Sequence, residues 1–104
     1  MNCLDDCHRY ELDNFDPQPG EGPKTLLVFY RMALDGTKTN GVTNEEVIKV
    51  LIHRLKFLND EWMGGKFNCL ENAHAIYYLE NALIQLEERT KNRIARGVEA
   101  THEA

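Results

Sequence analysis

Three arginines near the end of the chain are the residues best suited to bind an anion. Arg89, Arg93 and Arg96 recur at i, i+4 and i+7, so a helix through them presents three guanidinium groups on one face. A guanidinium donates two parallel hydrogen bonds to a phosphate and keeps its charge at physiological pH. The chain as a whole carries a formal net charge of −5. The spacing therefore indicates a local cationic site for an anionic ligand on an acidic protein.

Trp62 and Asn72 are the other candidate binding residues. Trp62, the only tryptophan, falls between two predicted helices, where its indole could stack on a base or hold the helices together. Asn72 falls one turn inside the second helix, where asparagine is a poor helix former, so its amide is expected to bond a ligand or the backbone. Arg89 follows 17 residues later, about 26 Å along a helix. A small ligand that touches both ends must therefore lie between two protomers.

The arginines also have a structural interpretation. Cations in the last turns of a helix complement its dipole and pair with acids one turn away, here Glu87 and Glu88. A solvated helix face is thus the alternative to an anion site.

The sequence indicates no catalytic or metal centre. The chain contains no serine, and no cysteine or carboxylate stands at a suggestive spacing from a histidine. Cys3, Cys7 and His8 resemble part of a zinc site, but no second pair of ligands follows at zinc-site spacing. We expect no metal, no cofactor and three free thiols, as in a reducing compartment.

Length and composition predict one small domain. The 104 residues are 42% hydrophobic, which is enough for a modest core. No apolar run approaches the roughly 18 residues of a membrane span. The N-terminus has neither the basic nor the apolar stretch of a secretory signal, so we expect an intracellular protein.

The first part of the chain predicts strands after a polar lead-in. Residues 1–24 are acidic and rich in proline and glycine, so we expect an extended lead-in. Residues 25–42 predict a β-hairpin: a strand over 25–32, a two-residue turn at Asp35 and Gly36, and a short return strand. Because an isolated hairpin is marginal in water, it must lie on the helices or pair with another chain.

Residues 43–104 predict a long antiparallel α-helical hairpin. Thr43 and Glu46 form a capping box for the first helix, which should end near Met63 because two glycines follow. Asn68 should cap the second helix, which should run about 30 residues to Gly97 and project beyond the first. The first helix has an apolar face, listed as Val47, Ile48, Leu51, Ile52, Leu55 and Leu58. The second has a seam, listed as Ala75, Ile76, Leu79, Leu83 and Leu86. The fold class is therefore α+β, a short β-hairpin followed by the helix pair, and the seam suits an oligomer.

The helical hairpin resembles a known phage family. The opening of the second helix, 68–73, and the run from Arg89 to His102 carry the resemblance. They are similar to the anti-Thoeris sponge proteins, the first Thoeris anti-defence family, whose hairpin is shared with the anti-CBASS cyclic-nucleotide sponges.

The resemblance implies sequestration without catalysis. Such proteins bind the cyclic ADP-ribose isomer made by the Thoeris system of an infected bacterial cell, in its cytoplasm, and do not cleave it. By position, Trp62 would stack on adenine, Asn72 would bond the nucleoside, and Arg89 and Arg93 would hold the pyrophosphate. Relatives assemble as hexamers and also take cyclic di- or trinucleotides in a second pocket, which we cannot place on this chain. We expect this chain to form a homodimer or a hexamer built from dimers. The acidic remainder disfavours long nucleic acids.

Two other functions remain open from the sequence. One is a helical protein-interaction module for a host or phage protein, with the arginines as a patch for an acidic partner. The other is a hydrolase acting on the same signal, which the lack of a nucleophile and base at suggestive spacing disfavours.

Overall fold

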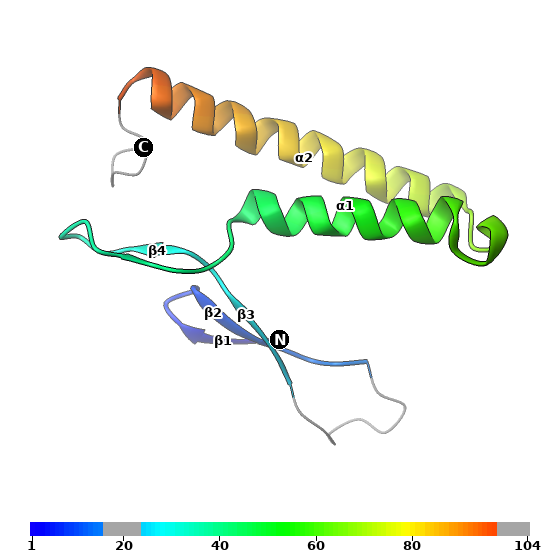
Figure 1. The fold of residues 1–104 in the computed structure, drawn as a ribbon, viewed down its shortest axis with the longest axis horizontal. Helices are drawn as coiled ribbons and strands as arrows, with labels where there is room; N and C mark the ends of the chain where they lie inside the picture. The colour runs from blue at the N-terminus through cyan, green and yellow to red at the C-terminus, as the bar shows by residue number, and fades with distance from the viewer. Residues whose placement is uncertain (16–23, 98–104) are drawn as a thin grey trace. The chain divides into compact units, whose positions relative to one another are not determined.

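The computed structural model describes residues 1–15 and 24–97 (Figure 1). It is an α+β chain, as predicted, that divides into two compact units, Met1–Thr43 and Asn44–Ala104. The proline-rich run within 16–23 and the closing residues 98–104, including Thr101 and His102, lie outside the described residues.

The N-terminal unit contains a three-stranded antiparallel sheet that the sequence analysis missed. Its strands are β1 (Asn2–Asp5), β2 (Arg9–Leu12) and β3 (Thr25–Val28), in the order β1-β2-β3. The expectation of an extended lead-in over 1–24 is therefore wrong for residues 2–12. The sequence signal for these strands is weak, because the alternation of apolar and charged residues in β2 is limited to Tyr10 and Leu12. Tyr10 is nevertheless half-buried, with its ring edge-on to Phe29 at 5.8 Å.

The predicted long strand over 25–32 is broken in two. After β3 comes β4 (Arg31–Met32), because the backbone of Val42 inserts beside Phe29 and Tyr30. The Val42 N–H donates to the Val28 carbonyl at 2.9 Å, and the Tyr30 N–H donates to the Val42 carbonyl at 2.9 Å. This close approach requires glycine at position 41, where any side chain would collide with the backbone of Phe29 and Tyr30.

A hairpin does form where the sequence predicts one. Strand β4 pairs with β5 (Lys38–Thr39). The loop has three residues rather than the predicted two, because the Ala33 N–H donates to the Thr37 carbonyl and leaves residues 34–36 between them. Gly36, the last of the three, adopts a left-handed conformation (φ 86°). Hydrogen bonds from the Thr37 side chain and backbone lower the pKa of the Asp35 carboxyl in this loop.

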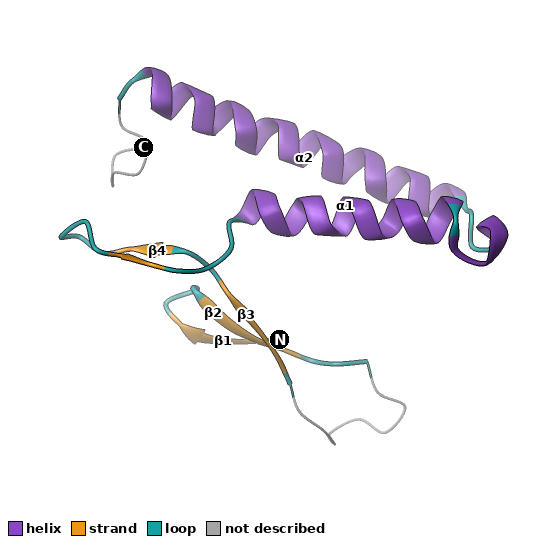
Figure 2. Ribbon diagram, viewed as in Figure 1, coloured by secondary structure: helices purple, strands orange, loops and turns teal. Residues whose placement is uncertain are grey.

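The C-terminal unit is an antiparallel helical hairpin (Figure 2). Helix α1 spans Asn44–Asp60, directly after Thr43, and ends three residues before the expected Met63. A short 3-10 turn, η1 (Trp62–Gly65), follows. Gly64 and Gly65 are left-handed as predicted, with φ of 67° and 80°, but they lie in this turn rather than at the end of α1.

Helix α2 spans Leu70–Ala95, and its predicted start is wrong by one residue. Cys69, not Asn68, is the N-cap, and its side chain makes no capping hydrogen bond. The reason lies in α1, where the buried Asn59 accepts the Cys69 backbone N–H at 3.0 Å. The far end is as expected, since Gly97 follows the helix with φ 73°.

The two helices bury a narrow stripe. Its most buried apolar side chains are Ile52 and Ile76, each 9% exposed. The predicted seam of α2 faces inward, and on α1 only Leu51 of the predicted face is exposed. Helix α2 extends past the start of α1, as expected (Figure 1). None of the described helices has the length and apolar composition to cross a bilayer.

Candidate functional site

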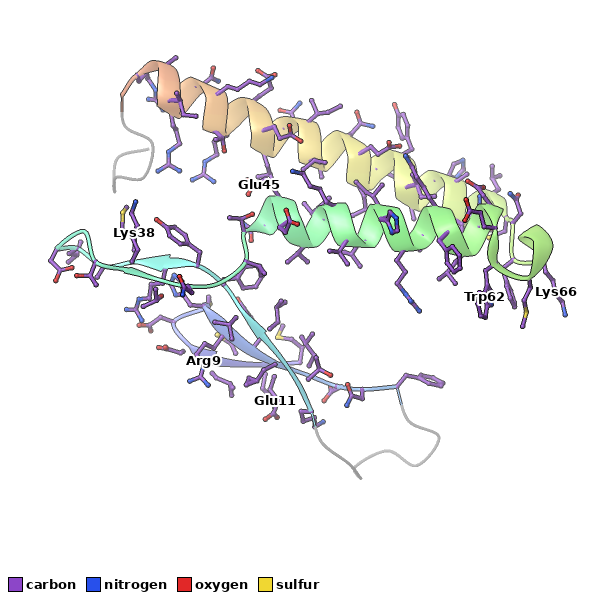
Figure 3. All side chains as sticks on the ribbon, in the orientation of Figure 1. Arg9, Glu11, Lys38, Glu45, Trp62 and Lys66 are labelled. Atoms are coloured by element: carbon purple, nitrogen blue, oxygen red, sulfur yellow. The ribbon has the colours of Figure 1, made fainter. Side chains whose placement is uncertain are left out.

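Trp62 offers an exposed aromatic ring at the interhelical turn (Figure 3). It opens η1 and is 43% exposed. Its ring contacts Phe57 of α1 at a centroid distance of 5.7 Å and an angle of 52°. One part of the indole therefore packs on the end of α1, while the rest can stack on a flat ligand.

Asn72 has a backbone partner. Its Nδ2 donates to the Phe67 carbonyl oxygen at 3.1 Å, which ties the first turn of α2 to the interhelical turn. The sequence left open whether this amide bonds a ligand or the backbone, and the structure shows the backbone bond. Among the described residues no donor reaches its Oδ1, so that oxygen can accept from a ligand.

The arginines lie at the other end of α2, within its last two turns and cap. Arg93 is half-buried on the inward stripe, whereas Arg89 and Arg96 are exposed. Glu88 pairs with Lys91 at 3.6 Å, and within the described part of the chain Arg89 makes no ion pair. Arg89 is therefore exposed to solvent, as the structural alternative expects, but its expected pairing with Glu87 or Glu88 is not seen among the described residues.

One chain does not bring the four predicted site residues together. Trp62 and Asn72 lie at the turn, and Arg89 and Arg93 lie at the opposite end of one continuous helix. The separation of about 26 Å calculated for a helix therefore applies. A single hairpin presents two half-sites, one aromatic and amide, the other cationic.

A groove between the helices escaped the sequence analysis. It encloses about 350 Å³ over Ile52, Leu83 and Ile84, with Lys56 paired to Glu80 at 3.2 Å on its edge. Lys49, His53 and Lys56, at i, i+4 and i+7 on α1, also line this groove.

An apolar ridge runs along one exposed flank of α2, beside the groove. Leu70, Tyr77 and Ile84 recur every seventh residue and are 67%, 62% and 54% exposed. Tyr78 adds its ring edge-on to Tyr77 at 5.5 Å. Exposed apolar side chains aligned in this way are typical of a surface that another molecule covers.

Comparison with known proteins finds a phage relative of this chain. No protein-family model matches the chain. The chain is 50% identical over 64 residues to "Thoeris anti-defense 1" of Bacillus phage SBSphiJ7. Over this stretch the chain is similar to an anti-Thoeris protein. The match covers 62% of this chain and 42% of the phage protein, so the chain aligns with less than half of this anti-Thoeris relative. The resemblance noted in the sequence is thereby confirmed.

Proposed function

We propose that the protein is a phage anti-defence protein that inhibits Thoeris by sequestering its cyclic ADP-ribose-type signal without cleaving it. The observation that carries this proposal is the 50% identity to Thoeris anti-defense 1. We further propose that it acts in the cytoplasm of the infected bacterial cell, where such a signal is made.

The binding site in this proposal is shared between two subunits. Two antiparallel copies of α2 place the turn of one subunit beside the last turns of the other. Trp62 and Asn72 of one chain then face Arg89 and Arg93 of its partner, and the two-fold axis makes two equivalent sites. The separation of the half-sites along one helix supports this arrangement. A dimer is the minimum assembly, and a hexamer would be three such pairs.

The side chains suit a nucleotide with a pyrophosphate. The arginine forks donate paired hydrogen bonds to phosphate oxygens. Stacking of Trp62 on adenine contributes about 1–3 kcal/mol, by analogy with bases on aromatic side chains. The Asn72 Oδ1 accepts from the nucleoside. Binding and slow release are sufficient for this function, because a sponge only has to outcompete the effector for the signal.

Calorimetry with recovery of the ligand tests the proposal. Cyclic ADP-ribose isomers are titrated into the protein. The ligand is then released with denaturant, and its mass is measured by mass spectrometry. We expect one ligand per chain and intact ligand on recovery. A cleaved product would make the protein a hydrolase, and the absence of binding by any isomer or cyclic di- or trinucleotide would overturn the proposal.

The exposed ridge on α2 favours a second candidate, a protein-interaction module. In that case Leu70, Tyr77 and Ile84 would bind a host or phage protein rather than a second copy. A thermal-shift screen separates the two, because a ligand that binds only the folded state raises the melting temperature with its concentration. An interaction module shows no such shift with nucleotides.

A further inference from the structure

The two cysteines of the first hairpin lie side by side. Cys3 is in β1 and Cys7 is in the turn before β2, and their Sγ atoms are 3.5 Å apart. The Cys7 backbone N–H also donates to the Cys3 sulfur at 3.2 Å. Four residues of extended strand span about 13 Å, so the turn is what brings the sulfurs together. Both thiols are free and exposed.

An unusual backbone holds this arrangement. Asp6 and Cys7 have φ of 40° and 62°, in the left-handed region that residues other than glycine rarely adopt. The His8 N–H closes the turn by donating to the Asp5 carbonyl at 2.7 Å. The β1–β2 register changes between Cys3 and Asp5. The fold thus maintains a strained turn whose effect is to place one thiol against another.

Tyr10 completes the cluster. It is the cross-strand partner of Cys3 in β2. Its hydrogen bond with the Cys7 side chain, and then its burial, raise the pKa of the Tyr10 hydroxyl. The hydroxyl therefore stays protonated and can donate to a neighbouring sulfur when that sulfur becomes a thiolate.

We propose that Cys3 and Cys7 form a redox modification site that closes to an intramolecular disulfide in the presence of a small-molecule disulfide. One thiolate attacks the small disulfide, forms a mixed disulfide and expels one small thiolate. The second protein thiolate then attacks the protein sulfur of the mixed disulfide, which forms the Cys3–Cys7 bond and expels the other small thiolate. The protein loses two electrons and two protons, and the small disulfide gains them as two thiols. The sulfurs must approach by about 1.5 Å to reach bonding distance.

The surroundings of Cys3 and Cys7 fit a disulfide better than a metal site. A structural zinc ion takes four ligands. Among residues 1–15 and 24–97, no three histidine, cysteine or acidic side chains gather at one point as a metal site would need. The inference concerns the N-terminal unit alone and uses none of the residues of the proposed ligand site, so either can fail without the other.

Mass spectrometry of the full-length protein in buffers of fixed reduced-to-oxidised glutathione ratio tests the proposal. We expect a loss of about 2 Da, with the link mapped to Cys3 and Cys7 by peptide analysis and reversed by dithiothreitol. At a given glutathione ratio, the ratio of Cys3–Cys7 disulfide to free dithiol should be at least about tenfold higher in the folded chain than in denaturing urea. An equal or lower ratio in the folded chain would overturn the inference.

Two variants serve as controls. Cys7→Ser should retain one glutathione on Cys3, because no second thiol remains to displace it. Cys69→Ser removes the exposed thiol of the other unit and should close as the natural chain does. A stable glutathione adduct on Cys3 or Cys7 of the natural chain, or a disulfide that includes Cys69, would contradict the assignment.

Discussion

Two asparagines hold the end of the helical hairpin by reaching the backbone from opposite sides. Asn59 of α1 accepts the Cys69 N–H, and Asn72 of α2 donates to the Phe67 carbonyl. Asn59 is 6% exposed and also donates to the Asp60 carboxylate at 3.0 Å. The loop that carries Trp62 is therefore fixed by side-chain hydrogen bonds as well as by its glycines.

Asn59→Ala should lower the free energy of unfolding by about 1–3 kcal/mol, because the Cys69 N–H loses its partner in a partly buried place. The matched control is Asn68→Ala, at the position that the sequence suggests as the cap. It should change stability by less than about 0.5 kcal/mol. Urea denaturation followed by circular dichroism measures both. Equal losses would show that Asn59 is not the residue that fixes the turn.

Arg93→Ala should weaken binding of the cyclic nucleotide at least about tenfold, since a charge-assisted hydrogen bond is worth about 1.5–3 kcal/mol. Lys91→Ala is the control, because Lys91 lies in the same turn but is exposed and pairs with Glu88. Calorimetry gives the affinities, and sedimentation shows whether each variant keeps its assembly. Unchanged affinity in Arg93→Ala would remove this arginine from the site.

At the scale of elements, the start of α2 is the place where one substitution is most clearly expected to increase stability. Its N-cap, Cys69, has an extended backbone (φ −156°, ψ 160°) that suits a capping residue, but its side chain makes no capping bond. Cys69→Ser should therefore raise the free energy of unfolding by about 0.5–1 kcal/mol. Thermal unfolding compares it with Cys69→Ala. If the serine variant is no more stable than the alanine variant, the cap geometry is not as described.

The helices were predictable from sequence because local signals agree with tertiary packing. The apolar periodicity of both helices, the glycines after α1 and Gly97 all act within a few residues, and each appears in the structure. Strands β1 and β2 were not predictable in this way. Strand β1 pairs with β2 across a tight turn, but β2 also pairs with β3, far along the chain, and charged residues such as Arg9 and Glu11 interrupt the apolar pattern.

The candidate site was predictable in part for the same reason. Helical spacing correctly separated Asn72 from Arg89 and Arg93 along one helix, and the structure shows both Asn72 and Arg93 half-buried. The start of α2 was misplaced because the Asn59–Cys69 bond joins residues of two different elements. The proximity of Cys3 and Cys7 depends on left-handed φ values at Asp6 and Cys7, and although aspartate tolerates this region, cysteine gives no signal of it.

For the whole molecule, the central claim is that neighbouring subunits combine their half-sites. A hairpin with a narrow buried stripe, an exposed ridge on α2 and its proposed binding residues at opposite ends is suited to work as a pair. Shared sites of this kind predict a behaviour that no single-chain site can show. Two variants that are each inactive should restore one another when their subunits exchange.

The most direct measurement is therefore complementation. Trp62→Ala and Arg93→Ala are prepared separately, and each should bind the cyclic ADP-ribose signal weakly or not at all. Mixed in equal amounts and allowed to exchange, they should recover about a quarter of the natural capacity, because half the dimers are mixed and each mixed dimer has one intact site. Calorimetry of the mixture measures this capacity. Recovery to that level is the predicted result, and a mixture that binds no more than its separate components would contradict the shared site.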